Sequence, residues 1–510
     1  MRRWAALVAS LVAVTSGGLA APVRAGSLVP IGPSDWPTYG HDAQHSFAGV
    51  TNAGLTQASA ASLAATWFFP TGDAVTANPV VVGTTVYVGS WDGYFYAIDR
   101  ARGTLHWKYR LRQQPAISPS PGNTSPRDVT SDGGLVTDSA WFEPGRGARP
   151  NLVIFAGGYT LYALNAATGA LYWSHDFTGL PEAPPSPGTD STRIFSSPVV
   201  LGNQVIVGVS SDGGTGHRGY LVSANLNDGS QVWRFETDVN TAGRVQNNGC
   251  GGVWSSPSLD PVRRLVFVGV ADCDLRGTPP YNQRVIALHA PDGSVAWVFT
   301  PPRLRGVSPG QDPRCDFDFG ATVNLGAPDP VSGAPGFLGI GGKDGSYYRL
   351  DPGTGHLIWQ HRVVFGGFAG GFIGTAAYDG HRVYAATAIG DVGSSSGTCS
   401  TDVTDTPVQE PSIHAFNPDG TIAWEGIGAQ SLGPTTVAGG MTFSGYAFGP
   451  VVQVHDGATG HLLTALPVAS SCFCGVTVSG NAVFFGTGSP QQGVGDGVYA
   501  FTPSAAPPSP

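Results

Sequence analysis

The feature that most constrains the fold of this 510-residue chain is a phrase repeated along most of its length. Each copy is a β-rich run, then small-apolar-Asp-x-x-x-Gly, then Trp four residues after the Gly. Full copies end at Trp107, Trp173, Trp233, Trp297 and Trp359, and a copy one residue shorter ends at Trp424. A seventh copy has Thr464 in place of the Trp. Such a chain is built from one recurring unit, and neighbouring units share their core.

The eighth copy is divided between the two ends of the chain. VYAFTP at 498–503 begins the phrase without its Trp, whereas AATWFFPTG at 64–72 contains Trp67 with no phrase before it. A first strand that completes the last unit closes a ring of β-blades and leaves no sheet edge exposed. The sequence therefore predicts an all-β protein, an eight-bladed β-propeller closed by N- and C-terminal strands that share one blade. A pair of β-sandwiches with accidental repeats is the alternative.

A second marker, a run of small residues where a strand begins, precedes each phrase. These runs are ANPVV at 77, TSDGG at 130, SSPVV at 196, SSPSL at 255, GATVN at 320, GTAAY at 374, GPTTV at 433 and GVTVS at 475. The 74 Gly and 41 Pro suit short strands joined by turns. We expect the propeller to span residues 66–503, between an N-terminal extension at 26–65 and a Pro/Ser-rich tail at 504–510. The repeat Trp residues are expected to pack between blades and to be structural.

Residues 1–25 have the pattern of a signal peptide, with a basic start, an apolar stretch and small residues at Ala20 and Ala25. With no other segment that reads as a membrane span, we expect a soluble protein that is secreted or periplasmic. Six cysteines in an exported chain favour disulfides over free thiols, and the fifteen possible pairings stay open. Cys250 with Cys273 and Cys472 with Cys474 are the pairs that we favour. A formal net charge of -9 offers no basic field for nucleic acid.

The eightfold phrase A-x-D-x-x-T-G-x-x-x-W resembles the quinoprotein alcohol dehydrogenases, whose propellers hold pyrroloquinoline quinone (PQQ) and calcium over the central channel. It equally resembles non-catalytic propellers such as outer-membrane assembly scaffolds. Because one fold hosts many functions, residues outside the repeat must separate the two.

One such segment is GGVWSSPSLDPVRRLVFVGVADCD at 251–274, which is similar to the cofactor segment of the quinoproteins. Trp254 lies three residues before Pro257, the small position of its strand start. The resemblance implies that Trp254 is the floor on which the quinone stacks and that Asp272 is a calcium ligand. A Trp that only fills the middle of the propeller is the alternative.

The same offset of three residues can be applied to the other strand starts. It gives Thr76, Phe195, Trp254, Asp318, Phe372, Ser431 and Phe473, among which Asp318 is the one carboxylate. D-F-D-F-G at 316–320 is similar to polyvinyl-alcohol dehydrogenases, and the quinoproteins place their catalytic Asp at this register. A carboxylate there would take the proton of an alcohol while hydride leaves its carbon for the quinone. Asp316 would bind substrate or orient Asp318. Two turn carboxylates that cap backbone N–H groups are the alternative.

Lys343 in GGKDG occupies the place where the family has a Lys or Arg that hydrogen-bonds the quinone carbonyl oxygens. A cation there stabilises the charge of the reduced cofactor; an ordinary turn lysine is the alternative. The segment DWPTYGHDAQHSF at 35–47 also looks like the polyvinyl-alcohol dehydrogenases, with His41 and His45 expected in a loop.

Two departures from the family pattern concern the lid and the metal. The dehydrogenases usually carry adjacent cysteines that cover the quinone, and this chain has no Cys-Cys dipeptide. The calcium-ligating Glu is replaced by Gly214, so that Asp212 is the nearest acid that could join Asp272.

The leading hypothesis is an exported quinoprotein that oxidises an alcohol, small or polymeric, with PQQ and Ca²⁺. It would pass electrons to a separate acceptor such as a cytochrome c. The rival is a propeller that serves as an extracytoplasmic binding scaffold without chemistry. A glycan-cleaving propeller would need paired carboxylates flanking a bond, for which Asp316 and Asp318 give weak support.

Overall fold

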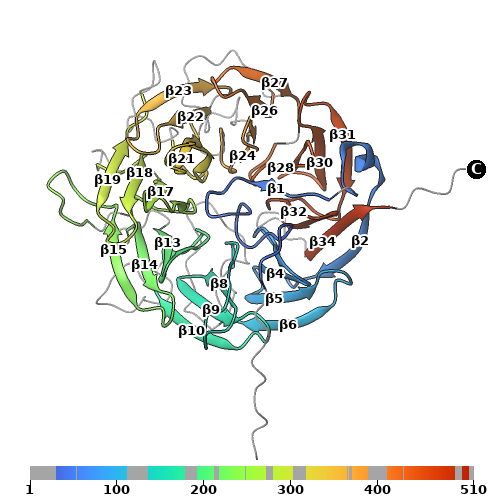
Figure 1. Ribbon diagram of the computed structural model, residues 1–510, viewed down its shortest axis with the longest axis horizontal. Coiled ribbons are helices and arrows are strands. Elements are labelled where there is room, and N and C mark those ends of the chain that lie inside the picture. The colour runs from blue at the N-terminus through green and yellow to red at the C-terminus, as the bar shows by residue number, and fades with distance from the viewer. Residues whose placement is uncertain are drawn as a thin grey trace, which may run out of the picture.

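A computed structural model describes residues 30–504 except 53, 112–135, 178–191, 212–217, 247–248, 272–279, 303–316, 365, 367–369, 389–410, 429 and 489–496. These residues form eight antiparallel sheets arranged as a ring around one axis (Figure 1). In this part of the chain, the 3₁₀ helix η1 (Gln57–Ser62) is the one helix. The prediction of an all-β, eight-bladed propeller is confirmed.

Each blade has an inner strand beside the axis and an outer strand at the rim of the ring. The first four blades consist of β3 (Val80–Val82), β4 (Thr85–Gly89), β5 (Tyr94–Asp99) and β6 (Leu105–Arg110); β7 (Trp141–Glu143), β8 (Leu152–Gly157), β9 (Thr160–Asn165) and β10 (Leu171–Asp176); β12 (Val199–Leu201), β13 (Gln204–Ser211), β14 (Tyr220–Asn225) and β15 (Gln231–Glu236); and β16 (Ser258–Asp260), β17 (Leu265–Gly269), β18 (Val285–His289) and β19 (Val295–Phe299). The short β11 (Thr192–Arg193) adds to β13.

The next three blades consist of β20 (Asn324–Pro328), β21 (Pro335–Gly341), β22 (Ser346–Leu350) and β23 (Leu357–Arg362); β24 (Ala377–Tyr378), β25 (Val383–Ala386), β26 (Ile413–Phe416) and β27 (Ile422–Gly426); and β28 (Thr436–Ala438), β29 (Met441–Gly445), β30 (Val451–Asp456) and β31 (Leu462–Pro467). The second strands of the blades are apolar and buried, as in LVFVG of β17. The outer strands alternate between inward and exposed residues, as in β6, because one face meets solvent.

The eighth blade joins the two ends of the chain. It consists of β32 (Thr477–Ser479), β33 (Ala482–Gly486), β34 (Gly497–Pro503) and, as its outer strand, β2 (Leu63–Pro70). β2 runs antiparallel to β34, with Trp67 opposite Ala500. The predicted shared blade is therefore present, and it leaves no open sheet edge where the ring begins and ends.

The repeat Trp residues join each blade to the next. The indole N–H donates to a backbone carbonyl of the following blade, as from Trp233 to Ala290 at 2.9 Å. The ring lies against the Gly of the next phrase: a Cβ on Gly293 would be 2.6 Å from Cε3 of Trp233. The other contacts of this kind join Trp67 to Gly103, Trp107 to Gly169, Trp173 to Gly229, Trp297 to Gly355, Trp359 to Gly420 and Trp424 to Gly460. The repeat Trp residues thus pack between blades, as predicted, and the structure shows that the Gly of the next phrase is their contact.

Thr464 stands where this contact has no partner Gly. It lies in β31, and the blade that follows is the one closed by the chain ends, so the outer β34–β2 pair lacks the phrase turn. Helix η1 precedes β2 and lies against β31 at this seam. The missing Trp is thus explained by the missing turn.

The small residues at the strand starts form a second ring of contacts near the axis. A backbone N–H in one blade donates to a side-chain oxygen in the next: Asn78 to Ser139 (2.8 Å), Ser139 to Ser197 (2.9 Å), Ser197 to Ser256 (2.9 Å), Ser256 to Thr322 (3.0 Å), Thr322 to Thr375 (3.0 Å) and Gly475 to Asn78 (2.9 Å). Ser and Thr are favoured here because a short hydroxyl satisfies a buried N–H in a crowded place.

In the second blade the strand start differs from the expected one. The hydroxyl ring passes through Ser139, two residues before β7. The TSDGG run at 130–134 lies outside the described residues.

The N-terminal segment 36–52 fills the central channel, a role that the sequence did not reveal (Figure 1, dark blue). It contains β1 (Ala48–Gly49), which pairs in parallel with β28. Its backbone bonds to the innermost chain of seven blades: Trp36 with Val81, Pro37 with Phe142, Ala43 with Leu259, Gln44 with Leu325, Ser46 with Tyr378, Phe47 with Val437 and Asn52 with Gly480. We call residues 36–52 the plug.

His41 and His45 lie in an irregular part of the plug, as expected. His45 is fully buried, however, and its two ring nitrogens lie 2.7 Å from the carbonyl oxygens of Tyr39 and Pro257. Burial lowers the pKa of the imidazole. His45 thus fixes the plug to the chain just after Trp254.

The cysteines in the described part of the chain are all oxidised. Cys472 and Cys474 form the local disulfide that was predicted. Cys250 is disulfide-bonded too, and Cys273, its expected partner, lies outside the described residues.

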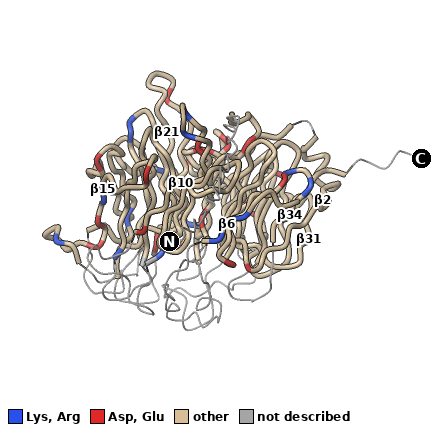
Figure 2. Tube along the Cα trace, turned by 90° about the horizontal axis from the view of Figure 1, so that it is seen from below, with Lys and Arg blue, Asp and Glu red and all other residues tan. Residues whose placement is uncertain are grey.

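Lys and Arg residues are interspersed with Asp and Glu residues along the described trace (Figure 2). They include no helix that is long and apolar enough to span a membrane.

The contact between Trp and Gly predicts a specific cost of adding one methyl group. Gly293 and Gly243 have nearly the same φ, +72° and +73°, but only Gly293 faces a Trp, whereas a Cβ on Gly243 would have no neighbour within 4 Å. Both Gly→Ala variants incur the left-handed backbone strain, about 1 kcal/mol. We expect Gly293→Ala to lose a further 1–3 kcal/mol or so in the free energy of unfolding, because the methyl group displaces the Trp233 ring.

Urea unfolding of the two variants measures this difference, with Gly243→Ala as the matched control. Equal losses in both variants would contradict a structural role of the Trp–Gly contact.

Candidate functional site

Three residues singled out in the sequence meet at the end of the ring where the inner strands begin. The Trp254 indole N–H donates to Oδ2 of Asp318 at 3.3 Å, and the Lys343 ammonium lies 3.2 Å from the same oxygen. Nζ of Lys343 is also 5.3 Å from the centroid of the Trp254 ring, within the range of a cation–π interaction. An aromatic ring, a carboxylate and a cation from two neighbouring blades therefore form one cluster, which we call the Trp–Asp–Lys cluster.

Trp254 owes its position to a glycine in the neighbouring blade. A Cβ on Gly320 would lie 1.7 Å from Cη2 of Trp254, so the benzene part of the indole occupies the space that any larger residue at 320 would need. Trp254 is only partly buried. The glycine of D-F-D-F-G is thus required for the ring to lie beside Asp318.

Asp318 lies in the irregular stretch that leads into β20 and is 7% exposed. Its carbonyl oxygen accepts a hydrogen bond from the backbone N–H of Lys343 at 3.0 Å. The backbone and the side chain of Lys343 therefore both hold Asp318. Since Lys343 is also only 7% exposed, the two charges compensate each other in a poorly solvated place.

The turn that carries Lys343 is built by the two residues after it. Asp344 accepts hydrogen bonds from the Ser346 N–H at 2.9 Å and from the hydroxyl of Tyr348. Gly345 follows with φ of +82°, a conformation that favours glycine. Burial raises the pKa of the Asp344 carboxyl. The K-D-G sequence is thus the turn that joins β21 to β22 and fixes the lysine.

The other acids predicted for the site, Asp316, Asp272 and Asp212, all lie outside the described residues, as does Gly214. Within the described ranges, no group of three or more His, Cys, Asp or Glu residues is placed to hold a metal ion.

Two polar residues of the same region escaped the sequence reasoning. Arg193 and Asn282 are each 6% exposed. Nε and Nη2 of Arg193 and both side-chain polar atoms of Asn282 are buried without a hydrogen-bonding partner in the described chain. Arg193 lies two residues before Phe195 of the strand-start ring, the offset that also relates Asp316 to Asp318. A comparison of the residues two positions before each member of the strand-start ring would have singled out Arg193 in the sequence.

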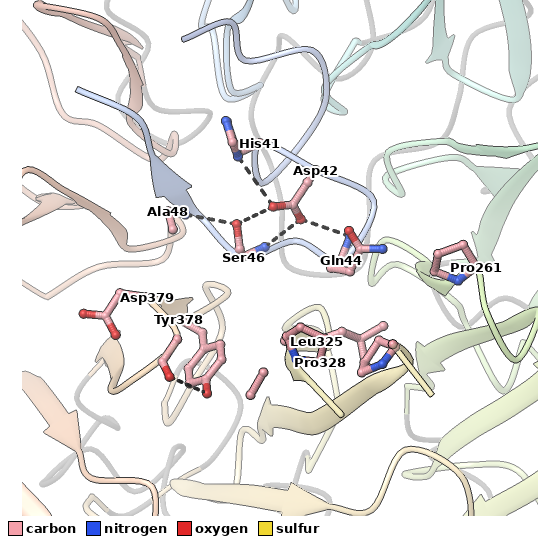
Figure 3. Close-up of a pocket in the computed structure, with 15 residues that line it drawn as sticks. His41, Asp42, Gln44, Ser46, Ala48, Pro261, Leu325, Pro328, Tyr378 and Asp379 are labelled. Carbon is pink, nitrogen blue, oxygen red and sulfur yellow. Dashed lines mark hydrogen bonds and ion pairs between the residues drawn. The ribbon is translucent and has the colours of Figure 1, made fainter. Parts of the chain in front are cut away.

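A separate cavity of about 460 Å³ lies on the far side of the plug (Figure 3). Plug residues such as His41 and Asp42 form one wall, and the turns after the inner strands, with Pro261 and Pro328, form the other. Asp42 accepts hydrogen bonds from the N–H groups of Gln44 and Ser46 and from the Ser46 hydroxyl. Because Trp254 precedes β16 and Pro261 follows it, this cavity and the Trp–Asp–Lys cluster lie at opposite ends of the channel.

Comparisons with known proteins agree with the fold. The PQQ family model described as "Glucose/ethanol/alcohol dehydrogenase, beta-propeller domain" matches residues 36–364. A polyvinylalcohol dehydrogenase of Pseudomonas sp is 25% identical over 398 residues, which are 71% of this chain and 57% of that protein. The chain spans about half the length of the curated relatives that it matches.

Two solved structures share the fold. The quinohemoprotein alcohol dehydrogenase of Comamonas testosteroni superimposes with a TM-score of 0.70 at 20% identity, over 94% of this chain and 82% of that one. BamB from Moraxella catarrhalis superimposes with a TM-score of 0.55 at 15% identity, over 87% of this chain and 100% of that one. At these identities the likeness establishes the propeller architecture alone.

The coupling of Lys343 to Asp318 predicts a non-additive effect on stability. Lys343→Met removes the cation and leaves the buried carboxylate beside Trp254, so we expect a loss of about 3 kcal/mol in the free energy of unfolding. In the double variant with Asp318→Asn the neutral amide needs no cation, and the loss should be smaller than the sum of the two single losses. Urea unfolding of the four proteins measures the coupling, and strict additivity would show that the two side chains do not interact.

Proposed function

The chain belongs to the PQQ family of glucose, ethanol and alcohol dehydrogenase β-propellers, and from this premise we propose that it is a quinoprotein that oxidises an alcohol. The observation that carries the proposal is the meeting of Trp254, Asp318 and Lys343, since the repeat itself requires none of them. Alcohols, polymeric ones included, are the proposed substrate class, supported by the likeness to polyvinylalcohol dehydrogenase.

The side chains around the cluster fit a flat, anionic quinone. Trp254 offers a partly exposed aromatic surface, and Lys343 offers a cation beside it. Arg193 and Asn282 contribute buried polar atoms that lack partners in the described chain, as expected where a polar ligand completes their hydrogen bonds. We therefore propose that Trp254 and Lys343 hold PQQ. The bound cofactor supplies a two-electron acceptor for the hydride of the alcohol carbon.

In this proposal Asp318 is the general base. Its Oδ2 is held by Trp254 and Lys343, which fixes the orientation of the carboxylate in a buried place. An alcohol hydroxyl within hydrogen-bonding distance gives its proton to this carboxylate as the carbon loses hydride, so that negative charge need not build up on the alcohol oxygen. Lys343 compensates negative charge that arises beside Trp254. Asp316 is proposed to bind substrate or to orient Asp318.

A calcium ion is part of the proposal through the family likeness and the sequence positions of Asp272 and Asp212. Such an ion would act as a Lewis acid on a quinone oxygen. Because both acids lie outside the described residues, no step of the reaction is derived through the metal.

A separate acceptor such as a cytochrome c is proposed to take the electrons, because each alcohol oxidation leaves two electrons on the cofactor. Export guided by residues 1–25 is proposed from their signal-peptide pattern.

A non-catalytic binding scaffold is the second candidate. The absence of a Cys-Cys dipeptide from the sequence and Gly214 at the place of the family Glu favour it. The buried Asp318–Lys343 pair favours the enzyme, because a scaffold gains nothing from keeping two charges out of water next to a partly exposed Trp.

One experiment separates the candidates. Purified full-length protein is given PQQ and Ca²⁺, cofactor binding is followed by Trp fluorescence, and dye reduction is measured with primary, secondary and polymeric alcohols. Absence of quinone binding at micromolar cofactor would sink the enzyme proposal and leave the scaffold.

If PQQ binds, Asp318→Asn should keep the cofactor and lower the turnover rate by about 10²- to 10⁴-fold, because the amide cannot accept the proton. Asp292→Asn, an exposed turn residue that accepts hydrogen bonds from Ser294, is the matched control and should leave turnover unchanged. Undiminished turnover in Asp318→Asn would remove Asp318 from the reaction.

A further inference from the structure

Arg193 is a buried cation without a counter-charge in the described chain. Its residue exposure is 6%, and its Nε and Nη2 atoms find no hydrogen-bonding partner there. Removing a guanidinium from water without giving it an acceptor is costly, so an unpaired buried Arg destabilises a protein unless a ligand completes it. Arg193 therefore needs a separate explanation.

The backbone places Arg193 on the side of the ring where the Trp–Asp–Lys cluster lies. The strand β11 pairs with the end of β13, with Arg193 directly opposite Ser210. Next to it, the N–H of Ile194 donates to the carbonyl oxygen of Gly158, in the turn between β8 and β9 of the second blade. Arg193 thus lies between the second and third blades, in the segment that leads to the inner strand β12.

The Ser210 side chain shows toward which neighbour one face of the β11–β13 pair is turned. Directly opposite residues of an antiparallel pair point to the same face of the sheet, so Arg193 and Ser210 share a face. A Cβ on Gly252 would lie 2.4 Å from Oγ of Ser210, so this face is turned toward Gly252 of the fourth blade. Gly252 is two residues before Trp254. The guanidinium of Arg193 therefore lies on the side that faces the Trp254 segment.

Asn282 approaches the same place from the fourth blade. The N–H of Ala271 donates to the carbonyl of Gly252, and the N–H of Gln283 donates to Ala271, which brings Asn282 next to this strip of backbone. Both polar atoms of the Asn282 side chain are also buried without a partner in the described chain. Two residues with unsatisfied polar atoms, one from each of two neighbouring blades, are thus linked through their backbone neighbours to Gly252.

The acids of this region are engaged elsewhere. Glu236 forms ion pairs with Arg218 and Arg234, each with an N–O distance of 2.8 Å. The second carboxylate of that strand end, Asp238, accepts from the N–H of Cys250. At the cluster itself, Asp318 and Lys343 compensate each other. A trianionic ligand seated on Trp254 would therefore find one net positive side chain among the described residues named here, that of Arg193.

We propose that Arg193 is the carboxylate-binding residue of the quinone site and that Asn282 assists it. The inference rests on the proposed function, because PQQ is the ligand whose carboxylates would complete the guanidinium. Lys343 and Arg193 would then bind different groups of the cofactor. The lysine would bind the quinone oxygens, and the arginine would bind a carboxylate at the other end of the flat ring system.

The first test measures affinity rather than activity. The dissociation constant of PQQ is determined by Trp fluorescence for the wild type, Arg193→Met and Arg193→Lys, in each case with full-length protein and Ca²⁺. Loss of a charge-assisted hydrogen bond should weaken PQQ binding by about 10- to 100-fold in Arg193→Met. Arg193→Lys should recover part of this affinity. The trimethyl ester of PQQ, which lacks the carboxylate charges, should bind to the wild type and to Arg193→Met equally.

The outcomes keep the two proposals apart. A wild type that binds no PQQ contradicts the proposed function itself. A wild type that binds PQQ while Arg193→Met binds it equally well contradicts only the role of Arg193.

The second test uses the stability of the cofactor-free protein. Because an unpaired buried charge is costly, Arg193→Met should raise the Tm of the cofactor-free protein, and PQQ should raise the Tm of the wild type more than that of the variant. Arg149, which pairs with Glu143 at 2.8 Å in the second blade, is the matched control: Arg149→Met should lower the Tm and leave PQQ affinity unchanged. A fall in Tm for Arg193→Met as large as that for Arg149→Met would show that Arg193 holds the fold together, and would overturn the proposal.

Discussion

The contact of each repeat Trp with a Gly of the next blade is the constraint on which the rest of the structure depends. A Trp side chain gives one blade a large apolar surface and an N–H donor, while the left-handed Gly turn of the next blade provides both a flat backbone and an acceptor. Neither residue can be exchanged alone. The contact repeats around the ring and ends at Thr464, where the blade made from both chain ends has no such turn. The repeat Trp is therefore missing at the interface with the blade that closes the ring.

Because these contacts at the rim hold the blades together, some residues near the axis are not needed for blade packing and can form a site. The strand starts are tied blade to blade by Ser and Thr hydroxyls, and the plug binds the innermost chain of most blades from the other side. A residue three positions before such a start is thus held at a fixed place near the axis without having to stabilise the blade. Trp254 and Asp318 occupy two consecutive positions of this kind, and Gly320 lets them touch.

Repetition explains how much of the molecule could be predicted. The blades, their closure through Trp67 and the neighbourhood of Trp254 and Asp318 follow from a periodic register, because equivalent positions in adjacent blades of a ring are neighbours. Lys343 does not belong to this register and was singled out only by the family resemblance of its GGKDG segment. The plug could not be predicted in this way, since residues 36–52 occur once and bond to many blades through backbone atoms that any sequence has. The second strand start was misplaced because the TSDGG run at 130–134 was used in place of the short TDSA stretch at 137–140, which contains Ser139. Arg193 lies two residues before the register position that was compared, and only the structure shows that it is buried without a partner in the described chain.

The distribution of charge links the fold to the proposed chemistry. In a chain of which only 12% of the residues are charged, buried cations near the axis are a cost that blade packing does not need. Lys343 is balanced by Asp318, and their neutral sum suits a site where a proton and a hydride leave one substrate together. Arg193 is balanced by no described acid, and its position facing the Trp254 segment suits a ligand that brings its own negative charge. A site that only bound a neutral alcohol would require neither cation, so the two together support the proposal of an anionic cofactor.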